Sequence, residues 1–310
     1  MNLTRRRFLR TAAMSSLAAP SIMRAERSIP EFEIGLVADA QFADIDAKGT
    51  RFYRQSIGKL GAAVEHFNGQ NLAFCVHLGD LIDREWRSFD EILRPLTKSR
   101  HRWHHLLGNH DFDVLDELKP QVPGRMGMER RYYSFDHGGY RFVVLDTNDV
   151  STYAHAAGTV ERAAAEDVLK RHESAKLIQA KPWNGGIGTA QLAWLDRTCA
   201  QALEMHYRRG VVILSHHPVW PDNAHNVWNA SEVLAVIDRH PHVVAWINGH
   251  NHAGNFAERN GLPFVTMRGM VETKDTTAFA TLRFAADRMV LSGHGREPSR
   301  ELKPRWPGLL

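Results

Sequence analysis

Apolar runs alternate with stretches of helical periodicity in the first third of the chain. Short apolar runs predict buried strands, and apolar positions three or four residues apart predict helices. Strands are expected over 32–38, 72–78 and about 103–107, with helices over 52–67 and about 86–98 between them. This β-α-β-α-β order implies parallel strands joined by right-handed crossovers.

The rest of the chain first continues this alternation and then turns to strands. We expect a hairpin over 132–135 and 140–146, helices at about 189–207 and 230–239, and strands at 211–214, 243–247, 262–267, 277–283 and 288–293. Residues 148–188 are polar and irregular, with one helix near 159–171, which is typical of an insertion over a site. Two stacked sheets between helical layers are therefore expected. No linker is evident, so we expect one domain over 26–310.

The charge of the chain is concentrated at its N-terminus. The 310 residues carry 39 Lys and Arg, and five of these are arginines within residues 1–25, which contain no acid. Without those five, the 39 fall to 34, against 35 Asp and Glu. The body of the protein is nearly neutral, which argues against a nucleic-acid partner because such a partner needs a clustered basic face.

Residues 1–25 are predicted to be a twin-arginine export signal. Thr4–Arg10 carries the paired arginines, a short apolar stretch reaches about Met23, and small residues suit cleavage between Ala18 and Ala25. The stretch is too short, and too broken by Pro20, for a stable membrane anchor. We expect the twin-arginine machinery as a partner and a periplasmic or secreted product. The alternative is a basic, disordered tail.

The two cysteines are expected to be separate buried thiols. Export permits a disulfide, but Cys75 falls in an apolar run that reads as a strand, and Cys199 falls in a predicted helix.

Five short blocks of polar residues follow or end apolar runs. They are Asp39-Ala40-Gln41, Gly79-Asp80-Leu81-Ile82-Asp83, Gly108-Asn109-His110-Asp111, Ser215-His216-His217-Pro218 and Gly249-His250-Asn251-His252. Open α/β sheets place their sites at the carboxyl ends of strands, so these blocks should meet there. Carboxylate, amide and imidazole ligands so placed can hold two divalent cations, which support in-line displacement at phosphorus.

Each block offers a ligand of a different kind. Asp80, at a strand end, can bridge two cations, and Asn109 offers a neutral oxygen. His250 and His252 can reach different metals because a turn follows the strand. His216 is the expected ligand of its block because it comes first after the strand, with His217 as the alternative.

His110 is the candidate catalytic residue. It follows Asn109 and could donate a proton to the departing oxygen, with Asp83 holding its ring in the donating tautomer. The alternatives are a positioning role or an ordinary loop histidine.

The ligand set contains no thiolate, which suits Mn²⁺, Fe²⁺ or Zn²⁺. Gln41 presents an oxygen where an imidazole could stand, and this favours Mn²⁺.

The blocks, in this order, resemble the calcineurin-like metallophosphoesterase superfamily, whose pattern is D-x-H, G-D-x-x-D, G-N-H-[DE], a lone His and G-H-x-H. The first block departs from that pattern, because Gln41 stands in place of its His. In this respect the chain is similar to the branch that includes the manganese-dependent ADP-ribose/CDP-alcohol diphosphatases. Further similarity lies in Ala38–Asp44, Gly49-Thr50-Arg51, Tyr53-Arg54, Asn184-Gly185-Gly186, Gln191-Leu192, Trp194-Leu195, Trp228-Asn229, Gly269–Glu272 and Ala278-Phe279.

The resemblance implies a four-layer α/β/β/α sandwich of two mixed sheets. It implies one metal held by Asp39, Gln41, Asp80 and His252, and a second held by Asp80, Asn109, His216 and His250. It also implies that His110 is catalytic and that a diphosphate linkage of a nucleoside-diphosphate sugar or alcohol is hydrolysed. Our hypothesis for the mechanism is in-line attack by a metal-bound hydroxide.

Candidates for substrate contacts are weaker. Phe42 could stack on a base or pack under the metal loop, and Arg51 could meet phosphate or stay solvated. The turn at Asn184 and Gly185 could let the backbone approach a ligand, or simply lead into a helix. Rival functions are a broad phosphomonoesterase or phosphodiesterase with the same site and, from another class, a secreted metal-binding protein without catalysis.

Overall fold

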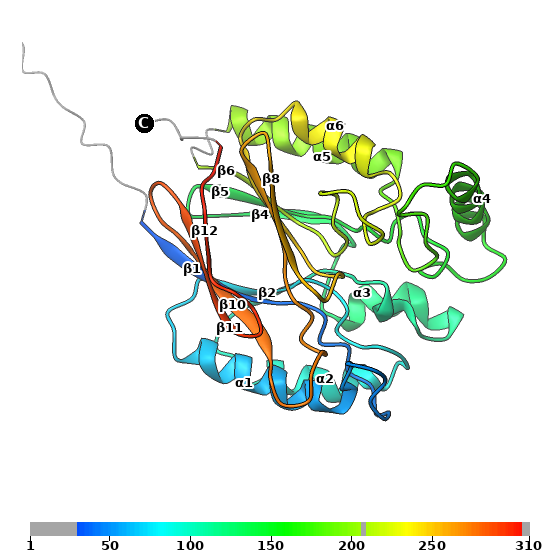
Figure 1. Ribbon diagram of the computed structural model, residues 1–310, viewed down its shortest axis with the longest axis horizontal. Coiled ribbons are helices and arrows are strands. Elements are labelled where there is room, and N and C mark those ends of the chain that lie inside the picture. Colours follow the sequence, from blue (N-terminus) through cyan, green and yellow to red (C-terminus); the bar gives the residue numbers. More distant parts are fainter. Residues whose placement is uncertain (1–29, 206–208, 306–310) are drawn as a thin grey trace, which may run out of the picture.

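Two six-stranded sheets stack face to face between layers of helices (Figure 1). The computed structural model describes residues 30–205 and 209–305. The first sheet has the order β12-β11-β10-β1-β2-β3, in which β1, β2 and β3 are parallel and β10 runs antiparallel to β1. Its strands are β1 Phe32–Val37, β2 Phe74–His77, β3 Trp103–His105, β10 Ala278–Phe284, β11 Met289–Gly295 and β12 Arg300–Leu302.

The second sheet has the order β4-β5-β6-β7-β9-β8. Its four central strands are parallel, and the edge strands β4 and β8 are antiparallel to their neighbours. Its strands are β4 Tyr133–His137, β5 Tyr140–Val144, β6 Gly210–Leu214, β7 Val243–Asn248, β8 Asn255–Arg259 and β9 Leu262–Thr266.

Helices cover the outer face of each sheet. On the first sheet, Leu60 of α1 and Ile92 of α2 share a buried cluster with Cys75 of β2. On the second, α5 and α6 pack in the same way against β6. The α-helices are α1 Ser56–Asn68, α2 Ser88–Leu96, α3 Val122–Arg125, α4 Val160–Ser174, α5 Thr189–Glu204 and α6 Ala230–Asp238. Among the described helices, none has the length and apolarity needed to cross a membrane.

The main core lies between the sheets. Leu36 and Val76 from the first sheet and Val144 and Leu214 from the second belong to one cluster of fully buried side chains. Burial of each such side chain contributes about 1.5–3 kcal/mol. Strands covered on both faces read as continuous apolar runs, which is why the sequence shows them clearly. The predicted four-layer α/β/β/α sandwich is confirmed.

The predicted elements are all present, with shifts at their ends. The sequence did not indicate β8, because an exposed edge strand lacks an apolar run, or β12, which has only three residues. Cys75 and Cys199 are buried and unpaired, as predicted. The predicted signal, residues 1–25, lies outside the described residues.

A buried lysine joins α1 to the loop after β9. The Lys59 ammonium donates to the carbonyl oxygens of Met270, Val271, Glu272 and Thr273 at 2.5–3.2 Å. It is 7% exposed. The Val271 carbonyl also accepts from the Phe52 backbone amide at 2.9 Å, whereas among the described residues the other three carbonyls depend on Lys59 for their hydrogen bonds.

Replacing Lys59 by methionine is expected to lower the free energy of unfolding by about 3 kcal/mol, since buried acceptors would lose their donor. Urea denaturation followed by circular dichroism measures the change. Lys98→Met, at an exposed position, is the matched control. Equal unfolding midpoints for the two variants would contradict the assigned role.

Candidate metal centre

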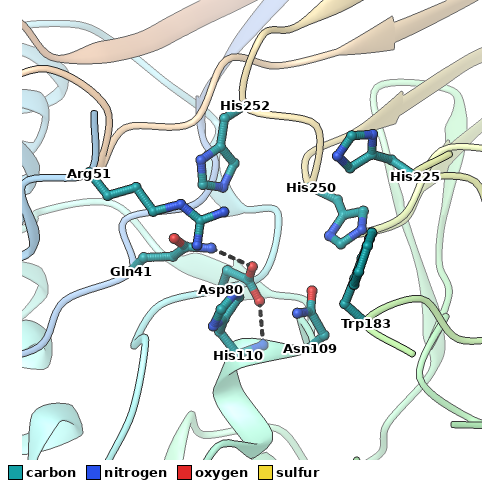
Figure 2. A pocket seen from close by; sticks show the side chains of 9 residues that line it. All are labelled: Gln41, Arg51, Asp80, Asn109, His110, Trp183, His225, His250 and His252. Carbon is teal, nitrogen blue, oxygen red and sulfur yellow. Dashed lines mark hydrogen bonds between the residues drawn. The ribbon is translucent and has the colours of Figure 1, made fainter. Parts of the chain in front are cut away.

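The five polar blocks converge at one edge of the stacked sheets. They follow β1, β2, β3, β6 and β7, whose carboxyl ends lie together because these strands are parallel within their sheets. A cavity of about 340 Å³ opens there (Figure 2). Its lining comprises Gln41, Arg51, Asp80, Asn109, His110, Trp183, His225, His250 and His252.

Several metal-binding candidates adopt the left-handed backbone conformation, which residues other than glycine normally avoid. The φ angle is +52° at Asp39, +44° at Gln41, +59° at Asp80 and +69° at His250. Each such residue costs about 1–3 kcal/mol and persists only where its surroundings hold it. Here the amide of Gln41 donates to the Asp80 carbonyl at 2.8 Å. Such strain is typical of a functional site.

Gly108 makes room for the Asp80 carboxylate. A Cβ atom at Gly108 would lie 2.1 Å from Asp80 Oδ1, which no side chain tolerates. The glycine in this block is therefore required by the close approach of two loops.

Asp111 holds the loop that contains Asp80 in place. Its carboxylate accepts hydrogen bonds from the backbone amides of Asp80, Leu81, Ile82 and Gly108 at 2.8–3.3 Å. The last residue of the third block thus shapes the site without facing the cavity.

One group of ligands forms around Asp39, Asp80 and His252, whose donor atoms lie within 4.8 Å of one another. Gln41 joins them: its amide nitrogen donates to Asp80 Oδ2 at 2.9 Å, as Figure 2 shows. Gln41 Oε1 is buried and has no hydrogen-bond partner among the described residues. A buried carbonyl oxygen without a donor is costly unless a cation meets it. These residues therefore fit a divalent cation.

A second group forms around His216, Asn109 and Asp80. His216 Nε2 lies 3.2 Å from Asn109 Oδ1 and 3.3 Å from Asp80 Oδ2. Its Nδ1 donates to the Leu78 carbonyl at 2.8 Å, which leaves the Nε2 lone pair for a metal. His250 lies beside it, with ring centroids 5.0 Å apart.

His217 is close to the same group, but the fold uses both of its ring nitrogens. The Thr147 hydroxyl accepts a hydrogen bond from the backbone amide of His217 at 3.2 Å and can donate one to His217 Nδ1 at 2.7 Å. Nε2 then donates to the Trp183 carbonyl at 3.4 Å. Proximity alone would include His217 among the ligands. The hydrogen bonds instead favour His216.

His252 is oriented by a carboxylate that lies far away in the sequence. His252 Nδ1 donates to Glu272 Oε1 at 2.7 Å, while Nε2 lies 3.6 Å from Asp39 Oδ1. From the sequence, Glu272 was only part of the segment Gly269–Glu272 that resembles the diphosphatase branch, and no role was predicted for it. A carboxylate behind a ligating imidazole fixes the tautomer and raises the basicity of the metal-binding nitrogen.

Glu272→Gln is expected to weaken binding of one Mn²⁺ about 10- to 100-fold, because the amide supports the imidazole less well. Isothermal titration calorimetry with Mn²⁺ measures the loss. Asp275→Asn, exposed on the same loop, serves as control and should bind Mn²⁺ like the parent protein. Unchanged affinity in Glu272→Gln would rule out this support.

The buried carboxylates give the site a strong attraction for positive charge. Burial alone would lower the pKa of His216, but Asp80 outweighs it and raises that pKa to about 9. Burial likewise opposes protonation of His252, yet Asp39 and Glu272 raise its pKa to about 9. Protons and metal cations therefore compete for the same nitrogens.

His110 occupies the cavity without belonging to either group of ligands. Its backbone amide donates to Asp80 Oδ1 at 2.8 Å. Its Nδ1 lies 3.1 Å from Asp83 Oδ1, a contact through which Asp83 can orient the ring, and no described residue forms a hydrogen bond with Nε2. Burial lowers the pKa of His110, but the charges of Asp80 and Asp83 outweigh burial and raise it.

Of the four candidates for substrate contacts, only one lines the cavity. Arg51 lines the cavity. Phe42 does not: it is 4% exposed and packs into the cluster under the metal loop. Asn184 is fully buried, and a Cβ at Gly185 would lie 2.3 Å from the Thr147 carbonyl. The close backbone approach predicted for Gly185 is therefore made to the protein itself.

Two residues that line the cavity were not predicted from the sequence. Trp183, 46% exposed, and His225 stand next to His250 in Figure 2. Both lie in irregular loops where no periodicity marks them. The predicted insertion places only its end residues at the site, while α4 extends to the side (Figure 1).

Comparison with known proteins gives consistent matches over most of the chain. The model of the calcineurin-like phosphoesterase family matches residues 33–254. A relative from Xenopus tropicalis, named manganese-dependent ADP-ribose/CDP-alcohol diphosphatase, is 30% identical and aligns over 90% of this chain and 96% of its own. A relative of the same name from Arabidopsis thaliana is also 30% identical, over 88% and 97%.

A solved structure is similar to this chain over most of its length. The crystal structure of a dimetal phosphatase from Danio rerio aligns with a TM-score of 0.79 and 28% identity, over 88% of this chain and 99% of its own. The family match and the ligand geometry confirm the predicted cofactor as two divalent cations. They also confirm a hydrolase that acts on phosphoester or phosphoanhydride bonds.

Proposed function

Because the chain belongs to the calcineurin-like phosphoesterase family, we propose that it hydrolyses the diphosphate linkage of nucleoside-diphosphate sugars or alcohols, of the ADP-ribose or CDP-alcohol type. The similarity to manganese-dependent ADP-ribose/CDP-alcohol diphosphatases along 90% of the chain carries this proposal. The unpartnered Gln41 oxygen in the cavity adds support, since an oxygen at this position suits Mn²⁺.

The residues that would hold the first cation are Asp39, Gln41, Asp80 and His252, and those for the second are Asp80, Asn109, His216 and His250. When bound, the pair would screen the phosphate charge and lower the pKa of water. Asp80 belongs to both sets, and its negative charge would reduce the repulsion between the two cations.

His110 would protonate the departing oxygen. Asp83 accepts from Nδ1, so Nε2 is the nitrogen available to the substrate. The raised pKa of His110 favours the imidazolium, which is the form that can donate a proton.

Arg51 is suited to the second phosphate of a diphosphate. It lies between the metal cavity and a neighbouring cavity of about 520 Å³ that also contains Lys48, Arg84 and His110. Its nearest carboxylate oxygen, on Glu272, is 3.8 Å away. The guanidinium is thus only loosely paired and can form bidentate bonds with phosphate.

Arg51→Met is expected to lower kcat/KM for diphosphates about 10- to 100-fold, the value of a hydrogen bond to a charged group. Steady-state kinetics with ADP-ribose measures the loss. Arg54→Met is the matched control, because Arg54 is engaged by Asp44 and Asp46 outside the metal cavity. Equal losses in both variants would contradict a phosphate contact.

A substrate panel tests the proposal. The protein is incubated with Mn²⁺ and ADP-ribose, CDP-alcohols or monoesters in ¹⁸O-labelled water, and mass spectrometry locates the cleaved bond. Cleavage between the two phosphorus atoms supports the diphosphatase. A preference for monoesters or diesters would favour the broad phosphoesterase, and Mn²⁺ binding without turnover would indicate a binding protein.

We also propose that residues 1–25 direct export through the twin-arginine machinery. The support is the order of paired arginines, apolar stretch and small residues. A double Arg5→Lys, Arg6→Lys variant should remain inside the cell in fractionation experiments, while the parent protein is exported. Equal distribution of the two would refute the proposal.

A further inference from the structure

We propose that Asn184 fixes the tautomer of His250, so that His250 binds its metal through Nδ1. Asn184 is then a positioning residue of the metal centre. This inference deepens the proposed function, but it depends only on the metal centre and not on the identity of the substrate.

The Asn184 amide can take only one orientation. Asn184 is fully buried, and its Nδ2 donates to the carbonyls of Gln179 at 2.9 Å and Ala224 at 2.7 Å. Both donor hydrogens are therefore used. A flipped amide would place Oδ1 against two carbonyl oxygens, which cannot donate. Oδ1 must face His250, whose Nε2 lies 2.9 Å away.

This contact determines which ring nitrogen of His250 carries the hydrogen. A side-chain carbonyl oxygen only accepts, so Nε2 must be the donor. In the neutral ring the lone pair then lies on Nδ1, and that atom is the only one able to ligate a metal.

His216, next to His250, is held in the opposite tautomer. Its Nδ1 donates to the Leu78 carbonyl, so its lone pair lies on Nε2. Two imidazoles expected on one cation are thus prepared by different acceptors, a backbone carbonyl and a side-chain amide. Tautomer control of this kind is usual behind metal-bound histidines.

The loop around Asn184 is well anchored. The backbone amide of Asn184 donates to the Lys181 carbonyl at 3.1 Å, and the backbone amide of Trp228 donates to the Gly185 carbonyl at 2.8 Å. Asn229 holds the same loop through two hydrogen bonds to Ile187, at 3.0 and 2.8 Å. The end of the polar 148–188 segment thus serves the metal centre.

Three variants of the full chain separate tautomer control from loop anchoring. Asn184→Leu and Asn184→Asp both lose the donors to Gln179 and Ala224, but only the aspartate keeps an acceptor for His250. Asn229→Ala loosens the same loop without touching His250. Each variant is titrated with Mn²⁺ by calorimetry and by electron paramagnetic resonance, which detects coupled Mn²⁺ pairs, and its melting temperature is recorded.

Asn184→Leu is expected to bind one of two Mn²⁺ ions about 10- to 100-fold more weakly and to lose the coupled signal at limiting metal. Asn184→Asp should melt at a similarly lowered temperature yet bind both ions within a few fold of the parent protein. Asn229→Ala should melt earlier with unchanged affinity. Parental affinity in Asn184→Leu, or equal weakening in both Asn184 variants, would overturn the proposal. Because no substrate is used, failure of the diphosphatase proposal would appear separately.

Discussion

Replacing Asp80 by asparagine is expected to lower kcat/KM by a factor of about 10³ or more, equivalent to at least about 4 kcal/mol of transition-state stabilisation. Asp80 contacts Gln41, the His110 amide and His216, and it belongs to both predicted ligand sets. Asparagine keeps the volume and one acceptor oxygen but removes the charge that would balance two cations.

The measurement combines kinetics with metal counting. Plasma mass spectrometry of the purified variant should show fewer than two Mn²⁺ per chain, and the melting temperature should no longer rise when Mn²⁺ is added, since ligand binding stabilises only the folded state. Asp90→Asn, at an exposed position on α2, is the control. An Asp80→Asn protein with two metals and more than a tenth of parental activity would disprove the bridging role.

His110→Ala should have the second largest effect, and its size should depend on the leaving group. An alkoxide needs a proton as it departs, so activity on alkyl monoesters should fall about 10²- to 10⁴-fold. A phosphate leaving group has a second pKa near 6 and needs little protonation. Diphosphates should therefore lose only about tenfold.

A series of esters with leaving groups of increasing pKa tests this directly. The slope of log kcat/KM against that pKa should steepen in His110→Ala. Asp83→Asn should move in the same direction by less, because it only orients the ring. Equal losses on monoesters and diphosphates would refute the proton-donor role and leave His110 as a positioning residue.

Most of the fold could be predicted because its strands are covered on both faces. Such strands appear as apolar runs, and a polar residue directly after each run marks the edge where ligands meet. Asp80 and Asn109 were found in this way. The edge strand β8 was not, since its five side chains alternate between half-buried and exposed and form no apolar run.

The sequence favoured His216 over His217 only because His216 comes first after the strand. Both follow β6, and both rings approach His250, with centroids 5.0 and 4.1 Å away. The difference lies in hydrogen bonds from distant segments: Thr147 and Trp183 occupy the nitrogens of His217, and Leu78 occupies only one nitrogen of His216.

The sequence by itself determined the layers of the fold, the order of the blocks and the types of ligand, because periodicity and residue chemistry are local properties. Only the tertiary structure decided how each ligand is held: Glu272 behind His252, Asn184 behind His250 and the unpartnered oxygen of Gln41. The first two contacts join residues 20 and 66 positions apart, and the Gln41 side chain is held by Asp80, 39 positions away. The direction of a side chain and the tautomer of an imidazole depend on neighbours that folding brings together, which no local pattern records.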